Sequence, residues 1–475
     1  MANTIFWYDF ETFSADPKAG RAAQFAGLRT DENLNVVGDP LVIYCKPSND
    51  FLPDPIACHI TGITPEEAQA KGLVEAQFIK TILNEFTVPN TCISGYNNIR
   101  FDDELTRQLL YRNFFDPYEH EYKNGNSRWD IIDMVRLCAA ARPEGIEWPK
   151  KDNGFVSFRL DELTIKNGIE HGSAHDALSD VRATIELAKL IKTSQPKLFD
   201  YCYSMRFKNV IKKIVNFETR RPFLLVSPLV SAKHGCLSLM MPLCLHPRLP
   251  NTVLAADLRQ DPQLWIDLSP EELRKRIFLA QSEIIAGKDR VLIRGIALNK
   301  CPVIVNFNVL DNDRALSLDI DIEASRKHWS ILAEASKRPQ GILHVVSEVF
   351  AQEPAGETDP DLMIYDRFFT KPDKRLMATI RETNPEDLNR FDFPFKDRRL
   401  KEMLFRYRAR NYLETLNSEE LALWEDFRMK RINSQKSREQ YNQSLLKAMD
   451  KGIHKDVLEK LEKYVFGLGI SITLG

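Results

Sequence analysis

Residues 1–195 alternate between strand-like and helix-like segments, and this alternation limits the possible folds more than any other feature of the chain. The first segment, Thr4–Phe10 (TIFWYDF), is rich in aromatic and β-branched residues, as strands are. Later segments have the helical spacing of apolar residues, and one of them stops at Gly168, a typical residue after a helix. The pattern is typical of an α/β domain. Strands are expected at residues 4–10, 36–44 and 88–95, and helices at 102–111, 129–140, 160–167 and 174–192.

The character of the chain changes after residue 196. Five short apolar runs, separated by turns rich in Pro, Asn and Asp, predict a small β-rich domain. Residues 351–361 (AQEPAGETDPD) are acidic and contain Pro and Gly, which favours a linker. Charged helical patterns continue from there to residue 475. A chain of this length has room for three domains of typical size, and we place them at residues 1–196, 197–352 and 353–475.

Charge and cysteine usage exclude several classes of protein. The formal net charge of −2 excludes a globally basic nucleic-acid-binding protein, so DNA or RNA would need a local basic groove. None of the eight cysteines forms a CxxC pair, which argues against a zinc knuckle and favours reduced, buried thiols. The first residues lack the basic segment of a signal peptide, and the most apolar stretch, 223–247, is interrupted by charged and Pro residues. We therefore expect a cytoplasmic protein that does not span a membrane.

Asp9 and Glu11 are the first candidates for a catalytic site. Side chains two apart in a strand share a face, so both carboxylates lie on one side while Phe10 lies on the other. Two like charges beside an apolar strand repel each other, and a divalent cation such as Mg²⁺ or Mn²⁺ removes that penalty. The alternative is a pair of solvated carboxylates at a strand end, since so short a motif also occurs by chance.

Two further segments supply carboxylates and a histidine. In GYNNIRFDDE a polar turn leads into a helix, where either aspartate could face a metal or simply cap the helix. We choose Asp102 over Asp103, because it follows Phe101, which anchors the loop. In AHDALSD, His175 lies at the start of a long helix, where a capping role is the alternative, and Asp180 lies about one and a half turns further in. Five such residues in this order, each on the expected element, are hard to obtain by chance.

The order D-x-E, F-D and H-x(4)-D resembles the DEDDh superfamily of 3′–5′ exonucleases over residues 1–195. The resemblance is closer still to the bacterial exonuclease I family, and it extends over almost the whole chain. Long sequence blocks carry it, and they are far more specific than the five-residue pattern. The blocks are WYDFETF, RAAQFAGLRTD, HITGITPEEA, GYNNIRFDDE, NSRWDIIDM, RPEGIEWP, SFRLDELTIKNGIEH, AHDALSDV, NKCP at 299–302 and LFRYRARN at 404–411.

The resemblance implies a ribonuclease H-like exonuclease domain followed by an SH3-like β-barrel domain and a helical C-terminal domain. It also implies two Mg²⁺ ions, for which Mn²⁺ can substitute. Asp9, Glu11 and Asp180 would hold one ion, and Asp9 with Asp102 would hold the other. Neutral His175 would act as general base toward the attacking water, and the products would be nucleoside 5′-monophosphates.

The family also places DNA contacts in the first domain. Arg159 suits bidentate binding of a phosphate oxygen, although the residue type alone favours an exposed helix start. Tyr118 and Tyr122 could stack on unpaired bases, with ordinary packing as the alternative. The block LFRYRARN would line or support the DNA channel, or else form a basic solvent-facing surface. The implied substrate-binding residues are Glu11, Arg107, Tyr118, Tyr122, Arg136 and Arg159.

A protein partner is implied as well. Relatives in this family bind the acidic C-terminal tail of single-stranded DNA-binding protein, which needs a basic rim beside an apolar pocket. The matching positions are Arg142 and Tyr201, which could instead cap a helix and pack between domains. The match departs at Asp311, where the family's pocket has a basic residue. The rim would then be rebuilt with Lys233, Arg314 or Arg326.

These features favour a monomeric, processive 3′–5′ exodeoxyribonuclease that degrades single-stranded DNA in repair and recombination. The alternative enzyme is a 3′–5′ exoribonuclease of the same superfamily, because the five catalytic residues do not separate DNA from RNA. The alternative outside enzymes is a non-catalytic single-strand-binding protein, and the intact set of five residues argues against it. Strand polarity follows from the resemblance alone.

Overall fold

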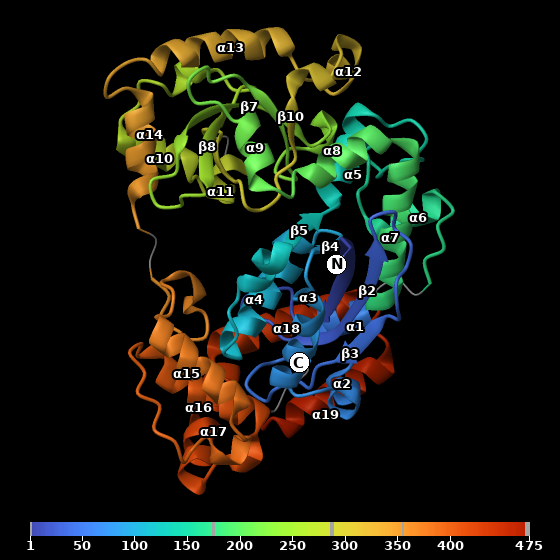
Figure 1. Ribbon diagram of the computed structural model, residues 1–475, viewed down its shortest axis with the longest axis vertical. Coiled ribbons are helices and arrows are strands. Elements are labelled where there is room, and N and C mark those ends of the chain that lie inside the picture. Colours follow the sequence, from blue (N-terminus) through green and yellow to red (C-terminus); the bar gives the residue numbers. More distant parts are fainter. Residues whose placement is uncertain (1, 173–175, 286–288, 354–355, 471–475) are drawn as a thin grey trace. The chain divides into compact units, whose positions relative to one another are not determined.

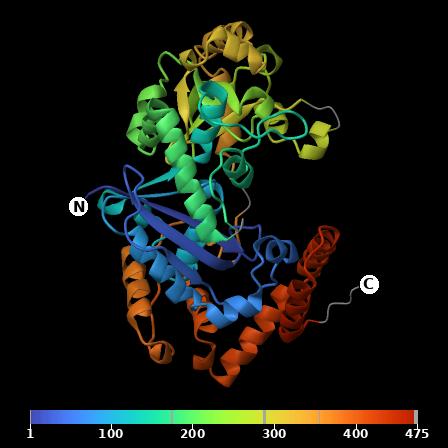
Figure 2. The same cartoon turned by 90° about the vertical axis from the view of Figure 1, so that its right-hand side faces the viewer.

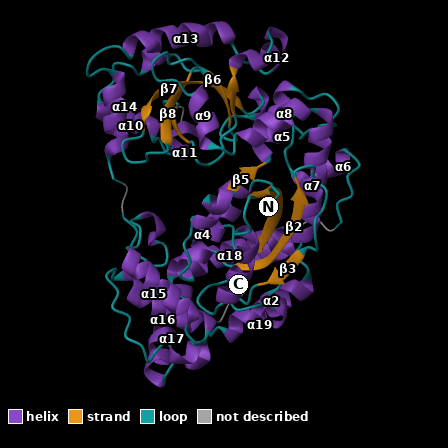
Figure 3. Cartoon of the chain, in the orientation of Figure 1, coloured by secondary structure: helices purple, strands orange, loops and turns teal. Residues whose placement is uncertain are grey.

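The computed structural model describes residues 2–172, 176–285, 289–353 and 356–470. The chain forms two compact units and contains two five-stranded sheets (Figure 3). The domain boundaries predicted at residues 196 and 352 stay predictions. The first unit comprises Met1–Ser127, His171–Ile185 and Gly356–Gly475, and the second comprises Arg128–Glu170 and Glu186–Ala355.

The first sheet has the strand order β3-β2-β1-β4-β5. Its central strand β1 runs antiparallel to β2 and parallel to β4. Aromatic side chains of β1, including Phe6, Tyr8 and Phe10, form a buried core that explains why this segment is a strand. The strand predicted at 4–10 is confirmed, and the one predicted at 88–95 begins only at Thr91, after a turn. The bounds are β1 Thr4–Thr12, β2 Ala22–Asp31, β3 Leu41–Tyr44, β4 Thr91–Gly95 and β5 Ser127–Asp130.

Helices of the N-terminal segment complete this α/β fold (Figure 1). Side-chain caps define where two of them begin: Asp54 accepts hydrogen bonds from the first turn of α1, and Thr64 does so for α2. The helices predicted at 102–111 and 174–192 correspond to α4 and α7. The bounds are α1 Pro55–Thr61, α2 Pro65–Lys71, α3 Glu75–Phe86, α4 Asp102–Arg112 and α7 Ala177–Ser194.

The C-terminal helices belong to the same unit. Helix α18 packs on α1 and α19 packs on α2, as Figures 1 and 2 show. Phe13 and Cys58 of the N-terminal segment share one hydrophobic core with Tyr441 and Leu461. This confirms a helical C-terminal region and shows that it completes the core beside the first sheet. The bounds are α15 Lys371–Glu382, α16 Arg399–Asn411, α17 Ser418–Ile432, α18 Gln435–Asp450 and α19 Lys455–Gly467.

The second unit is built on an antiparallel sheet of order β10-β6-β7-β8-β9. All five apolar runs of the sequence form its strands, as predicted. The strands are β6 Phe223–Val226, β7 Leu237–Leu245, β8 Thr252–Asp257, β9 Ile293–Ala297 and β10 Ile304–Asn306. The helices are α5 Ile132–Ala141, α6 Leu160–Lys166, α8 Pro196–Ser204, α9 Lys208–Ile214, α10 Pro270–Ile277, α11 Gln281–Ile285, α12 Asn312–Ser317, α13 Ile322–Ala335 and α14 Ile342–Ala351.

Two predicted elements are corrected. The helix expected at 129–140 begins only at Ile132, because Trp129 lies in β5 and the Asp130 side chain accepts a hydrogen bond from the Ile132 amide at 3.0 Å. The strand expected at 36–44 is restricted to Leu41–Tyr44, after Pro40. No helix formed by the described residues has the length and apolar character needed to cross a lipid bilayer.

Candidate active site

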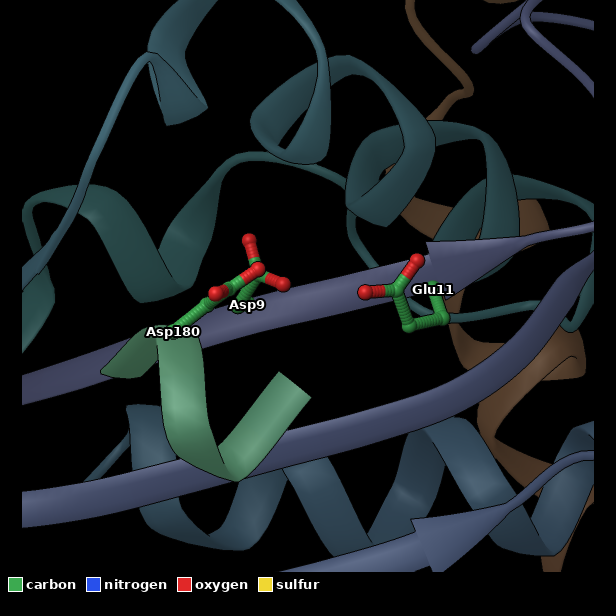
Figure 4. Close-up of side chains that lie close together, drawn as sticks. All are labelled: Asp9, Glu11 and Asp180. Atoms are coloured by element: carbon green, nitrogen blue, oxygen red, sulfur yellow. The ribbon is translucent and has the colours of Figure 1, made fainter. Parts of the chain in front are cut away.

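Asp9 and Glu11 lie on one face of β1, toward its C-terminal end (Figure 4). The strand pairs with β2 so that Asp9 is opposite Ala26 and Glu11 is opposite Gln24. Phe10 turns to the other face and joins the aromatic core. The alternation of the strand therefore brings the two carboxylates together while an aromatic side chain fixes the strand between them.

Asp180 completes a cluster of three carboxylates. It lies in the first turn of α7, and one oxygen each from Asp9, Glu11 and Asp180 lies within 4.8 Å of the others (Figure 4). Gln24 accepts a hydrogen bond from the Ala177 amide at 3.3 Å, which ties the start of α7 to β2 beside Glu11. Hard oxygen ligands at this spacing fit a divalent cation.

Burial and mutual repulsion control the ionisation of this cluster. Glu11 is only 7% exposed, and burial, followed by the charges of Asp180 and Asp102, raises its pKa from 4.5 to about 9. Burial, followed by the charges of Asp102 and Glu11, likewise raises the pKa of Asp9 well above its ordinary value. Carboxylates in such a site hold protons unless a cation neutralises them. The residues present therefore fit a metal ion in both geometry and charge.

Asp102 begins α4 and is buried near the cluster. Its charge raises the pKa of both Asp9 and Glu11. The neighbouring Asp103 is engaged by Tyr8, whose hydroxyl donates a hydrogen bond to it at 2.6 Å. Asp102 stays the predicted ligand of the two, and the tight cluster found among the described residues does not include it.

Two histidines bear on the site. The general base predicted at His175 lies outside the described residues. A second histidine, His171, is buried, and its Nε2 lies 2.5 Å from Oδ1 of Asp180. Sequence reasoning missed this residue, because a histidine nine positions before an aspartate has no spacing that signals a metal site.

Besides Glu11, three predicted DNA contacts lie in the first unit. Tyr122 is 64% exposed, and the half-buried ring of Tyr118 packs edge-on against Phe368 at 5.9 Å. Arg107 is buried, pairs with Glu121 at 2.7 Å, and lies 5.8 Å from the Tyr118 ring centre. The guanidinium of Arg107 is thus satisfied within the protein, where it positions Tyr118, while both tyrosines keep accessible surface.

Sequence reasoning missed two aromatic residues beside these tyrosines. Phe368 is 77% exposed and Tyr365 is 54% exposed, both in the segment before α15. The Tyr365 hydroxyl donates a hydrogen bond to Glu104 of α4, which holds this segment against the first fold. We call Tyr118, Tyr122, Tyr365 and Phe368 the aromatic surface. Tyr365 and Phe368 lie in a short 3-10 turn and the irregular segment after it, where no periodic pattern marks an exposed ring.

Arg136 and Arg159 lie in the second unit. Arg159 precedes α6, is largely exposed, and pairs with Asp161 at 2.7 Å. Arg136 is mostly buried, pairs with Asp133 at 2.5 Å, and lies 5.8 Å from the ring centre of Phe158. Of the two, Arg159 has the accessible guanidinium, and its predicted contact with the scissile phosphate stays a prediction.

The predicted partner residues also lie in the second unit. Arg142 is exposed and donates to the Val309 carbonyl at 3.1 Å, and the Tyr201 hydroxyl donates to the Ile304 carbonyl at 2.8 Å. A pocket of about 950 Å³ is lined in part by Asn306 and Phe307, which follow Ile304 closely in the sequence. Its lining includes Lys213, Arg221, Phe307, Ile322, Arg326 and Trp329.

Asp311 stands where the family's pocket has a basic residue, and it has a structural role in this chain. Its side chain caps α12 by accepting a hydrogen bond from the Arg314 amide at 2.7 Å. The Arg314 guanidinium in turn donates to the carbonyls of Ala139 and Ala140, and Lys233 pairs with Asp319 at 2.8 Å. Lys233, Arg314 and Arg326 were predicted to rebuild the basic rim of the partner pocket. Of these three, only Arg326 lines the pocket.

The arginines of LFRYRARN neither line an open channel nor face solvent. Arg410 is buried and pairs with Asp50 at 2.9 Å and with Asp361 at 2.6 Å, while Arg406 pairs with Asp361 at 2.9 Å. Arg408, also buried, pairs with Glu420 of α17. The block therefore supports the unit from inside, and it joins the C-terminal helices to the loop that follows β3.

A sheet of this order with carboxylates converging from β1 and α7 defines the class of exonucleases with a ribonuclease H-like fold. The family model described as Exonuclease matches residues 6–188. The models described as Exonuclease I SH3-like domain and Exonuclease I C-terminal domain match residues 206–352 and 358–468. The chain belongs to the exonuclease I family.

Known relatives match over nearly the full chain. Exodeoxyribonuclease I of Escherichia coli is 43% identical over 90% of this chain and 89% of its own length. The Haemophilus influenzae protein of that name is 40% identical over 99% and 98%. The structure of E. coli exonuclease I with a dA16 oligonucleotide matches with a TM-score of 0.92 and 41% identity, over 98% of this chain and 100% of that one. Other matching structures are a zinc-bound E. coli exonuclease I–ssDNA complex and SSB/Exonuclease I with the inhibitor CFAM.

Proposed function

We propose that this protein is a metal-dependent exodeoxyribonuclease that degrades single-stranded DNA processively from the 3′ end. The observation that carries the proposal is the cluster of Asp9, Glu11 and Asp180, whose charges are compatible with burial only when protons or a cation neutralise them. The relatives named exodeoxyribonuclease I, and the E. coli structure with a dA16 oligonucleotide, support DNA as the substrate.

The carboxylates divide between two ions in this proposal. Asp9, Glu11 and Asp180 would hold one Mg²⁺, and Asp102 with Asp9 would contribute to a second, with Mn²⁺ as a substitute. When bound, such cations activate a water and stabilise charge on the scissile phosphate. The zinc-bound E. coli structure supports a divalent cation without specifying Mg²⁺. His175 would accept the proton of the attacking water.

The aromatic surface would hold the single strand behind the reacting end. Exposed rings such as Phe368 and Tyr122 stack on any base, because every base presents a π-face. Duplex DNA hides these faces, so unpaired 3′ ends are expected to be strongly preferred. Arg159 would bind the scissile phosphate through its accessible guanidinium.

End-labelled oligonucleotides test the proposal. We expect Mg²⁺-dependent release of 5′-mononucleotides from single-stranded DNA, a much slower reaction on blunt duplex, and no reaction in EDTA. Label at the 5′ end reports shortening from the 3′ end. Equal degradation of RNA would favour the exoribonuclease alternative, and binding without hydrolysis would favour the non-catalytic one.

We also propose that the pocket lined by Arg221, Arg326 and Trp329 receives the acidic tail of single-stranded DNA-binding protein. Three cationic residues stand beside apolar and aromatic side chains there, which is the chemistry that an acidic tail ending in phenylalanine requires. The structure of SSB/Exonuclease I supports a partner of this kind for the family. Titration of a labelled tail peptide should show binding that Arg326→Ala weakens, whereas the control Arg338→Ala, at an exposed position outside the pocket lining, leaves it unchanged.

A further inference from the structure

We propose that His171 positions Asp180 for the divalent cation, an inference that rests on the proposed function and deepens it. Nε2 of His171 lies 2.5 Å from Oδ1 of Asp180, and only 4% and 19% of the two side chains are exposed. A hydrogen bond donated by the ring nitrogen to Oδ1 holds the carboxylate group in one orientation toward the cluster. Such a contact, shielded from solvent, fixes the carboxylate's rotation.

The residue after His171 also lies close to α7. Gly172 approaches the first turn of the helix so closely that a Cβ atom there would lie 3.2 Å from Oγ of Ser179. On the other side, the hydrogen bond from the Ala177 amide to Gln24 ties the helix to β2. Asp180 is therefore held from two directions, by a helix anchored to the sheet and by the His171 ring.

His171 touches a ligand without joining the ligand set. Among the described residues, the side chains whose donor atoms cluster within 4.8 Å are Asp9, Glu11 and Asp180, and His171 is not one of them. Hydrogen-bond partners of metal-ligating carboxylates orient the ligand, and their removal typically weakens metal binding by about 10–100-fold. A general base, in contrast, leaves metal affinity unchanged when it is removed. His171 is thus assigned as a positioning residue.

Two polar substitutions separate this role from a general effect on folding. The amide nitrogen of glutamine reaches the place of histidine Nε2, whereas asparagine is one methylene shorter. We expect His171→Asn to bind Mn²⁺ about 10–100-fold more weakly in calorimetry without DNA, and His171→Gln to bind nearly as tightly as wild type. The activity of His171→Asn should recover at saturating metal. His59→Gln, in α1, is the matched control and should change nothing.

The outcomes are distinct. Unchanged Mn²⁺ affinity of His171→Asn would overturn the inference. A second contrary result would be a lower hydrolysis rate that saturating metal does not restore, together with an altered pH profile of the rate. Equal weakening by Asn and Gln, with a lowered melting temperature in both, would reduce the contact to ordinary packing and also overturn it. If wild type neither binds Mn²⁺ nor degrades single-stranded DNA, the proposed function itself fails. Wild-type activity together with a normal His171→Asn variant would remove only the positioning role.

Discussion

Replacing Glu11 by glutamine tests whether electrostatic repulsion within the carboxylate cluster destabilises the metal-free protein. Burial and the charges of Asp180 and Asp102 raise the pKa of Glu11 from 4.5 to about 9. When folding raises the pKa of a carboxyl group, the group does not lower the free energy of unfolding at a pH below its pKa in the unfolded chain. As the pH rises from there toward its pKa in the folded protein, the loss of stability grows. Between these two values the metal-free protein therefore loses about 1.4 kcal/mol per pH unit through this group.

The magnitude follows from the working pH. At about pH 7.5, roughly three units above the unfolded pKa, the cost reaches a ceiling of about 4 kcal/mol. Glu11→Gln has no group to titrate, so the metal-free variant should be more stable than metal-free wild type by up to that amount, and by little near pH 5. Saturating Mg²⁺ should stabilise wild type more than the variant, which has lost a ligand.

Thermal unfolding in EDTA and in Mg²⁺, at both pH values, measures these differences. Each kcal/mol shifts Tm by about 2–4 °C in a domain of 150–250 residues. Glu414→Gln removes an exposed carboxylate from the same unit and should show no pH-dependent gain. The reasoning is refuted if metal-free Glu11→Gln melts at the wild-type temperature at pH 7.5, or if its gain is equally large at pH 5.

Four further substitutions probe the site and its support. Asp180→Asn should abolish hydrolysis of labelled single strands with an unchanged circular dichroism spectrum, because it deletes a metal ligand; retained activity in Mg²⁺ would contradict this. His175→Ala should lower the single-turnover rate by about 10²–10⁴-fold and keep calorimetric metal binding, whose loss would make His175 a ligand instead. Phe368→Leu should weaken single-strand binding by about 1–3 kcal/mol, and an unchanged Kd would remove the aromatic surface from the DNA path. Asp361→Asn should cost about 3–5 kcal/mol in chemical denaturation, since Arg410 keeps a buried charge without this partner; a neutral effect would mean that Asp50 alone suffices.

Local periodicity accounts for what the sequence predicted well. The strand of Asp9 and Glu11 has a period of two and strong aromatic content, so both the element and the shared face of the carboxylates follow from short-range rules. The same holds for α4 and α7, whose apolar spacing is helical. The prediction failed at Trp129, where helical spacing ran on through a strand and a turn, and only the hydrogen bond to Asp130 marks the true helix start.

Long-range contacts account for what the sequence could not predict. Arg406, Arg408 and Arg410 read as a basic helix surface, because nothing near them in sequence shows that they are buried. Their burial depends on carboxylates such as Asp50, which is 360 positions away from Arg410. His171 was missed for a similar reason: its contact with Asp180, nine positions away, exists only in the folded chain.

Helix α4 connects the two parts of the proposed site within one rigid element. Its first residue, Asp102, adds its charge to the carboxylate cluster. Near its other end the Tyr111 ring stacks on Phe369 at 5.5 Å, next to the exposed Phe368. Eleven helical residues span about 16 Å, so α4 fixes the separation between the metal site and the aromatic surface. A single strand stacked on that surface would present its end to the metal site at one distance whatever its bases. The C-terminal helices belong to the same compact unit as the carboxylate cluster, and in the proposed mechanism degradation independent of sequence would follow from a fixed helix rather than from base recognition.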